Sequence, residues 1–114
     1  KANAYYISAF SALNPDEKVQ EFTARFEEAY GSTPNSNATF AYDAAAMVIQ
    51  AISEAETLDG PGIRDALAAI QYDGVTGTTT FDADRNPVKD ANILRFSGNE
   101  IEYVTAVKAS DLAE

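Results

Sequence analysis

The stretch FTARFEEAYGSTPNSNATFAYDAAAMVIQAISEA, residues 22–55, decides the fold of this chain. It predicts two helices joined by a polar loop, and Gly31 ends the first because glycine tolerates a left-handed conformation. One face of the first helix carries apolar residues at helical spacing: Val19, Phe22, Phe26, Ala29 and Tyr30. The second helix, from about Thr39 to Glu56, is apolar around most of its circumference, which predicts that it is buried as the central helix.

The segments before and after this stretch predict a strand and a third helix. Ala4–Phe10 is rich in aromatic residues that favour strands. Asn14-Pro15-Asp16-Glu17 has the composition of a helix start, with Asn14 as the expected cap. Residues 59–62, DGPG, break the chain before a short amphipathic helix that ends near Ile70.

The last third of the chain predicts strands. Gly74 and Gly77 bracket a turn, residues 78–81 favour a strand, and residues 82–87 form a polar turn. Residues 92–107 predict a hairpin with a glycine-containing loop, followed by a frayed tail at residues 108–114. This order indicates an α/β fold in which three helices pack on strands from both chain ends.

Composition excludes several classes of protein. The 114 residues suffice for one modest domain, and 46% of them are hydrophobic. Eight basic and eighteen acidic residues give a net charge of −10, which repels nucleic acid and anionic membranes and serves mainly solubility. Without Cys or His, the chain has no thiol nucleophile, no His-based triad and no Cys/His zinc site. We therefore expect no cofactor and no metal.

The start of the chain suggests an excerpt of a longer protein, and the composition does not decide its compartment. No apolar run approaches the ~20 residues that cross a bilayer. The sequence starts at Lys1 without Met or a signal peptide, as a piece of a longer protein would. The lack of Cys fits export as well, although many cytosolic proteins share it.

Residues 82–86, DADRN, match the first five positions of a calcium loop. The match then fails, because Pro87 stands where the sharp turn needs glycine and Ile93 where the ion needs a bidentate glutamate. We expect a turn that uses Asp and Asn for local hydrogen bonds.

Two further patterns have simple explanations. Asn37-Ala38-Thr39 is a glycosylation sequon, but such tripeptides often arise by chance. The acidic pairs Asp16-Glu17 and Glu27-Glu28 are sequence neighbours that point about 100° apart on a helix. They cannot converge on one substrate atom as a catalytic carboxylate pair must. The sequence therefore predicts no enzyme.

The loop-to-helix junction at residues 37–43, NATFAYD, is the one candidate binding site. A helix start offers unpaired N–H groups and a positive dipole end to a carboxylate. Thr39 adds a hydroxyl, and Phe40 and Tyr42 add aromatic surface of the kind that lines apolar pockets. The alternative is that Thr39 only caps the helix and that both aromatic rings pack into the core.

Three segments in this order resemble one family: residues 22–55 with Tyr42-Asp43-Ala44, then DGPGIRDALAAI (59–70) and YDGVTGTTTFDADRNPV (72–88). They resemble the C-terminal third of the periplasmic leucine/isoleucine/valine-binding proteins, the solute receptors of branched-chain amino acid ABC transporters. The resemblance covers about residues 3–107. It implies a fragment of the two-lobed type I periplasmic-binding-protein fold.

The resemblance also implies how the chain is divided. In that family three strands cross between two α/β lobes, and ligand is trapped as the lobes close about this hinge. Residues 9–13 would be the second crossing and residues 82–88 the third. About residues 14–85 would come from one lobe, and residues 3–8 and 91–107 from the other.

The implied function is solute binding for an ABC importer, with recognition of an amino acid, branched-chain or similarly small and polar, by cleft closure. Thr39 and Phe40 would contact the ligand, while Tyr42 and Asp43 would serve helix packing and capping. The partners would be the ligand and the membrane permease, with no nucleic acid. The protein would be periplasmic or extracellular, as a cell-surface lipoprotein of a bacterium.

Two other functions stay open: an extracellular sensor domain of a signalling receptor, and an interaction module without a small ligand. We also expect the isolated chain to form a symmetric homodimer. Its apolar second helix and its open strand edges would lack the neighbours that a whole lobe supplies. A monomer with terminal strands folded over the helices is the rival outcome.

Overall fold

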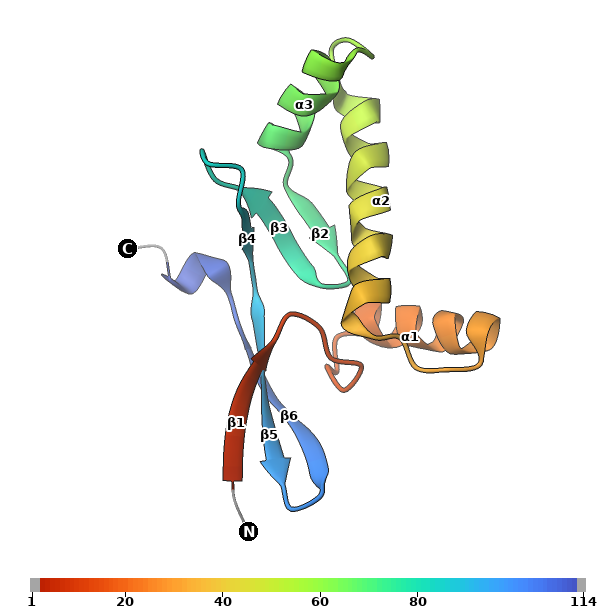
Figure 1. Cartoon of the computed structure of the whole chain (residues 1–114), viewed down its shortest axis with the longest axis vertical. Helices are drawn as coiled ribbons and strands as arrows, with labels where there is room; N and C mark the ends of the chain where they lie inside the picture. Colours follow the sequence, from red (N-terminus) through yellow and green to blue (C-terminus); the bar gives the residue numbers. More distant parts are fainter. Residues whose placement is uncertain (1–2, 113–114) are drawn as a thin grey trace.

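The computed structural model describes residues 3–112, which form two three-stranded antiparallel sheets (Figure 1). The terminal sheet has the order β1-β5-β6 and joins the two ends of the chain: β1 (Asn3–Ser8), β5 (Ala91–Ser97) and β6 (Glu100–Val107). The inner sheet has the order β2-β3-β4 and lies entirely within the chain: β2 (Tyr72–Gly74), β3 (Gly77–Phe81) and β4 (Pro87–Lys89).

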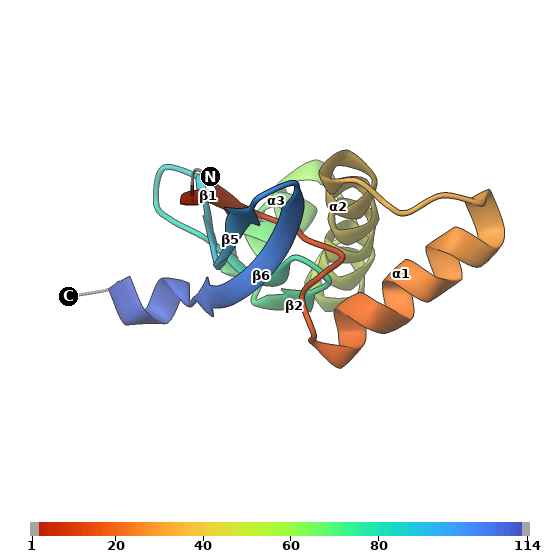
Figure 2. The same ribbon diagram turned by 90° about the horizontal axis from the view of Figure 1, so that it is seen from below.

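Three α-helices come between β1 and the inner sheet: α1 (Glu17–Tyr30), α2 (Ser36–Glu54) and α3 (Gly60–Ala69). Helices α2 and α3 flank the inner sheet, and α1 extends away from both sheets in the two views (Figures 1 and 2). The radius of gyration is 16.2 Å, whereas a compact chain of this length has about 13 Å. The chain is therefore open and elongated, with extents of 56 × 41 × 19 Å.

Polar side chains set the helix starts. Asp16 accepts from the Lys18 N–H at 2.9 Å, so the cap of α1 is Asp16 and not Asn14 as predicted. Asn35 caps α2 by accepting from the Ala38 N–H at 3.0 Å. Helix α2 therefore begins at Ser36, three residues before the predicted start. At the other end of α1, Gly31 adopts φ 71° and ends the helix as predicted.

Helix α2 is far more exposed than predicted. Only Thr39, Asp43 and Ala51 are buried, and Ile49 is 68% exposed. An apolar circumference predicts burial only if enough neighbours surround the helix, and here α3 is its main helical neighbour. The buried apolar core is correspondingly small: Phe10, Val19, Ala51, Ile70, Val75 and Leu94.

The predicted hairpin at the end of the chain is confirmed. Strands β5 and β6 pair antiparallel around a tight connection in which Gly98 adopts φ 69°. Strand β1 pairs with β5, and the rings of Tyr6 and Phe96 stack at 5.0 Å. The predicted frayed tail is wrong for residues 109–112, which form a 3₁₀ helix (Ala109–Leu112). Residues 113–114 lie outside the described part of the chain.

Candidate functional site at the passage between the sheets

The chain passes between the two sheets at two places. Residues 9–16 lead from β1 to α1 and form the long passage. Asp90 alone separates β4 from β5 and forms the short passage. The predicted crossing at residues 82–88 is wrong, because Pro87 and Val88 pair with β3 inside the inner sheet.

The polar turn predicted at residues 82–87 is confirmed as a local structure. The Asp82 carboxylate accepts from the N–H groups of Asp84 and Asn86 at 2.9 and 2.8 Å. These hydrogen bonds hold the pKa of Asp82 below its ordinary value. Arg85 takes the left-handed conformation at φ 69° that closes the turn. Within residues 3–112 no cluster of three acidic side chains is arranged to hold a metal.

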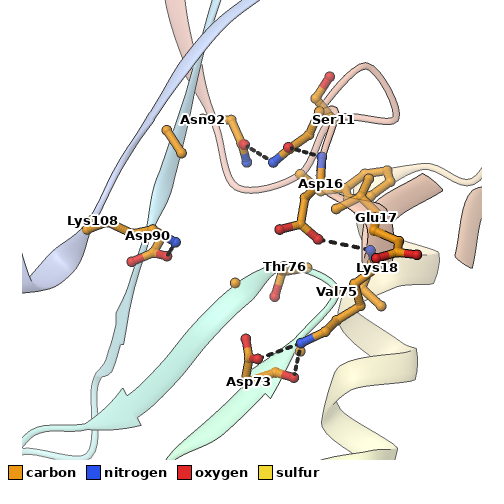
Figure 3. Close-up of a pocket in the computed structure, with 16 residues that line it drawn as sticks. Ser11, Asp16, Glu17, Lys18, Asp73, Val75, Thr76, Asp90, Asn92 and Lys108 are labelled. Carbon is orange, nitrogen blue, oxygen red and sulfur yellow. Dashed lines mark hydrogen bonds and ion pairs between the residues drawn. The ribbon is translucent and has the colours of Figure 1, made fainter. Parts of the chain in front are cut away.

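A cavity of about 340 Å³ lies between the two passages and the inner sheet (Figure 3). The long passage, the start of α1, the β2–β3 turn and the ends of β5 and β6 all contribute to its wall. Most of the charged lining is acidic, with two lysines: Asp16, Glu17, Asp73, Asp90, Lys18 and Lys108. Phe10, Val19 and Val75 form its apolar floor and belong to one buried cluster.

The buried carboxylate of Asp43 fixes the β2–β3 turn that lines this cavity. Asp43 is 1% exposed, and it accepts from the N–H groups of Val75 and Thr76 at 3.0 and 2.8 Å. The Thr76 hydroxyl also donates to it, at 2.6 Å. Gly74 leaves room for this contact, because a Cβ there would lie 2.6 Å from an Asp43 carboxylate oxygen. Asp43 therefore caps a turn rather than a helix, which corrects the predicted role.

Lys89 connects this network to the short passage. Its ammonium donates to the hydroxyls of Thr76, at 2.7 Å, and Thr79. Burial lowers the pKa of Lys89, and the carboxylates of Asp43 and Asp90 oppose that shift in part. A half-buried ammonium needs such acceptors, since it loses part of its contact with water. The short passage is thus anchored in the inner sheet through a side chain that reaches into it.

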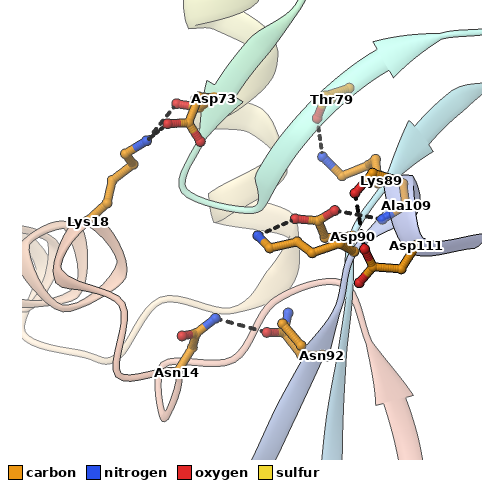
Figure 4. A network of polar contacts seen from close by, with 12 residues as sticks. Asn14, Lys18, Asp73, Thr79, Lys89, Asp90, Asn92, Ala109 and Asp111 are labelled. Carbon is orange, nitrogen blue, oxygen red and sulfur yellow. Dashed lines mark hydrogen bonds and ion pairs between the residues drawn. The ribbon is translucent and has the colours of Figure 1, made fainter.

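Asp90 is held from the opposite side (Figure 4). Its side chain is 10% exposed, and it accepts from the Lys108 ammonium at 2.7 Å and the Ala109 N–H at 2.9 Å. Burial by itself would raise the pKa of Asp90, but the Lys108 ammonium and the Ala109 N–H outweigh it and lower that pKa. The carboxylate is therefore ionised at neutral pH.

Two further contacts shape the cavity wall, and Figure 4 shows both. The Asn14 side-chain amide donates to the side-chain oxygen Oδ1 of Asn92 at 2.9 Å, which ties the long passage to β5. Asn92 is only 7% exposed. Lys18 of α1 pairs with Asp73 of β2 at 2.6 Å, and both side chains are largely exposed. The ion pair therefore contributes little stability by itself.

The structure places the predicted site residues away from this cavity. Residues 37–43 lie inside α2, and the Thr39 N–H already donates to Asn35 O at 3.2 Å. Thr39 is fully buried, and its hydroxyl donates to the same carbonyl at 2.9 Å. Phe40 is 38% exposed. Tyr42 packs against Phe22 with ring centroids 4.8 Å apart, but it is 47% exposed, so neither ring is buried in the core.

Sequence reasoning missed Asp43, Lys89, Asp90 and Asn92 as a group. One signal was present for Asp43: it is the only charged residue in a run that is otherwise apolar and small, residues 38–49. A carboxylate in an apolar helix needs a buried hydrogen-bond partner. The other three residues carry no local signal, because their partners lie 10 to 78 positions away.

Comparison with known proteins identifies a family. Residues 1–100 match the family model described as periplasmic binding protein. No curated protein sequence matches the chain. None of the helices within residues 3–112 is long and apolar enough to span a membrane.

Three solved structures illustrate the likeness. A putative branched-chain amino acid ABC transporter from Rhodospirillum rubrum has 30% identity and a TM-score of 0.78 over 88% of this chain. An ABC transporter substrate-binding protein from Desulfitobacterium hafniense, in complex with Leu, has 25% identity and a TM-score of 0.73 over 88%. A solute-binding protein of an ABC transporter from Rhodopseudomonas palustris BisB5, in complex with 3,4-dihydroxybenzoic acid, has 20% identity and a TM-score of 0.80 over 94%. The chain spans 30–31% of the length of these three proteins.

Proposed function

The chain belongs to the periplasmic binding protein family, and on that premise we propose that it contributes to both sides of a closing solute cleft. Its fold is a piece of the type I periplasmic-binding-protein fold. Proteins of this family bind solutes rather than catalyse reactions, and they act in the periplasm or outside the cell. The proposed role is the C-terminal third of the solute-binding component of an ABC importer.

One observation carries this proposal: two separate sheets joined only through a long and a short passage, with a cavity between them. In the proposed division, about residues 14–85 belong to one lobe, and residues 3–8 and 91–107 to the other. The three helices and strands β2 and β3 fall in the first group and the terminal sheet in the second, whereas β4 lies between the two groups. Such a layout suits lobes that rotate about the passages.

The proposed solute is an amino acid, branched-chain or of similar size. Two relatives were solved with leucine and with 3,4-dihydroxybenzoic acid, and a third with benzoate. These three compounds share a carboxylate beside an apolar or aromatic group. The test below therefore includes both amino acids and aromatic acids.

Thr39 and Phe40 remain the proposed ligand contacts in this chain, with unequal support. The Phe40 ring is partly exposed, so it can face a ligand. Thr39 stays in the proposal by its position alone, because its side chain is fully buried and its hydroxyl already donates to Asn35.

The remaining parts of the proposal concern assembly. The partner of the receptor would be a membrane permease, and the receptor would be a lipoprotein at a bacterial surface. Isolated copies of the chain would pair through apolar residues that α2 leaves exposed, such as Val48, Ile49 and Ile52. Light scattering tests the pairing, and a mass near 12.2 kDa that persists on concentration would contradict it.

The experiment is a calorimetric titration of the receptor-length protein, which adds to this chain the upstream sequence that its relatives have. The titrants are leucine, isoleucine, valine, benzoate and 3,4-dihydroxybenzoate. We expect one class to bind saturably. This chain alone should bind none of them with submicromolar affinity, because one side of a cleft buries too little of a ligand. A folded receptor-length protein that binds no titrant would contradict the proposal.

Phe40→Ala and Tyr42→Ala then test the site in the receptor-length protein. Phe40→Ala should weaken binding and leave the melting temperature nearly unchanged. Tyr42→Ala should mainly lower stability, because Tyr42 packs on Phe22. Unchanged affinity with a large loss of stability in Phe40→Ala would show that these two roles are reversed.

A further inference from the structure

The short passage differs from an ordinary strand connection because charged side chains hold it on both sides. We propose that Asp90 is the positioning residue of the hinge, the fixed point that sets the angle between the two sheets. The inference deepens the proposed function and rests on it for its meaning in solute binding.

Residues that follow the last strand of the terminal sheet donate hydrogen bonds to the Asp90 carboxylate. Lys108 and Ala109 directly follow β6, whose last residue Val107 pairs with Ala91 next to Asp90. Both carboxylate oxygens are engaged, since Oδ2 accepts from the Lys108 ammonium and Oδ1 from the Ala109 N–H. These contacts orient the carboxylate relative to β5 and β6.

The inner sheet packs closely against the same carboxylate. A Cβ added to Gly77 would lie 3.0 Å from Asp90 Oδ2, so the start of β3 runs directly against it. Gly77 adopts φ 87°, a conformation that also favours glycine. The backbone N–H of Thr78 adds to the groups that lower the pKa of Asp90. One carboxylate therefore contacts both sheets at the point where the chain passes between them.

Lys89 prevents this point from sliding along the inner sheet. Its ammonium reaches Thr76 and Thr79, and Thr76 in turn donates to the buried Asp43. Lys89 thus holds the passage to the inner sheet, and Asp90 holds it to the residues that follow β6. Among the described residues, the long passage has no such pair of oppositely charged anchors. Only one of its side-chain hydrogen bonds reaches β5 or β6, the one from Asn14 to Asn92.

It follows that the angle between the sheets can change without a large change in the stability of the fold. The Lys108 side chain is 57% exposed although its partner Asp90 is only 10% exposed, so solvent screens this ion pair and its contribution to the free energy of unfolding is modest. Its loss should nevertheless release the Asp90 carboxylate from its fixed direction. The angle between the sheets should then vary more widely, while the melting temperature hardly changes.

The experiment measures the distance between the sheets in this chain without any solute. Because the chain has no Cys, Ser53→Cys in α2 and Thr105→Cys in β6 can carry one spin label each, at exposed positions. The labelled chain is diluted into an excess of unlabelled chain, so that paired copies add no label-to-label distance. Pulsed electron paramagnetic resonance then gives the distance distribution for the parent, Asp90→Asn and Lys108→Met. Asp84→Asn, an exposed acidic residue of the β3–β4 turn, is the matched control.

We expect a broader distribution for Asp90→Asn and for Lys108→Met, no further broadening when both are combined, and a parent-like distribution for Asp84→Asn. Equal widths in all five proteins would overturn the proposal. If Asp90→Asn lowers the melting temperature strongly, Lys108→Met decides, because its exposed side chain can be removed without harm to the core. The absence of solute keeps this outcome separate from any failure of solute binding.

Discussion

The two passages both connect the sheets, but different kinds of side chain hold them in place. The short passage uses charged groups. The half-buried Lys89 and Asp90 contact the inner and the terminal sheet, and the buried Asp43 supports the turn beneath them. The long passage uses an apolar side chain, Phe10, which is 6% exposed and packs with Val19 and Val75. Directional hydrogen bonds fix an angle, whereas apolar contacts tolerate sliding. The proposed hinge would therefore have one fixed point and one adjustable connection.

The largest predicted effect comes from the support of the short passage. Asp43→Ala should lower the free energy of unfolding by about 4 kcal/mol, because it leaves two buried N–H groups and a hydroxyl without their acceptor. Urea denaturation measures the change. Asp65→Ala, which removes an exposed carboxylate paired with Arg64, should change stability by less than about 0.5 kcal/mol. An Asp43 variant as stable as the Asp65 variant would show that the turn does not depend on this carboxylate.

The apolar anchor of the long passage ranks second. Phe10→Ala should cost about 3 kcal/mol, at the low end for a buried aromatic residue because its cluster is small. Leu13→Ala, in the same passage but 52% exposed, is the control and should cost under about 1 kcal/mol. Equal losses in the two variants would remove the distinction between an apolar anchor and a passive loop.

The hydrogen bond between the long passage and β5 should contribute less. Asn92→Ala should lower stability by about 1 kcal/mol, and Asn14→Ala by a similar amount. Because both substitutions remove the same bond, the double variant should lose clearly less than the sum. Additive losses would mean that the two amides act independently and that this contact does not tie the long passage to β5.

The smallest effect is a pH dependence at the short passage. The folded-state pKa of Asp90 is lowered, whereas the unfolded value is about 3.9. Its stabilisation is therefore complete above the unfolded pKa and is lost as pH falls through the lower folded pKa. Lys108 and Lys89, the cations near it, stay charged throughout. In thermal melts below about pH 4, Asp90→Asn should lose less stability than the parent, by under about 1 kcal/mol. Parallel pH curves would contradict this.

Local sequence signals predicted much of the fold. Gly31, the DGPG break at residues 59–62 and the hairpin loop around Gly98 were sufficient, because each depends on the conformational preference of a few neighbouring residues. The start of α2 was missed because two capping candidates, Asn35 and Thr39, lie four residues apart. The predicted burial of α2 was wrong because a helix with an apolar circumference is buried only where neighbours surround it. This chain spans about 30% of the length of its relatives.

The contacts that hold the two passages between the sheets could not be predicted from neighbouring residues in the sequence. Asp43 pairs with residues 32 and 33 positions away, and Asn14 with a residue 78 positions away. Such pairs follow from the topology and not from spacing. Asp90 shows the limit most clearly, since the family resemblance placed the crossing at residues 82–88. The pairing of Pro87 with Phe81 keeps those residues in one sheet and moves the crossing to residue 90.

Small-angle X-ray scattering of the receptor-length protein, with and without the solute that calorimetry identifies, tests the central claim most directly. If this chain holds parts of two lobes that close about Asp90, saturating solute should lower the radius of gyration. Asp90→Asn should change the radius of gyration of the solute-free protein more than that of the saturated one. Saturable binding with no change in the radius of gyration would contradict closure about this hinge.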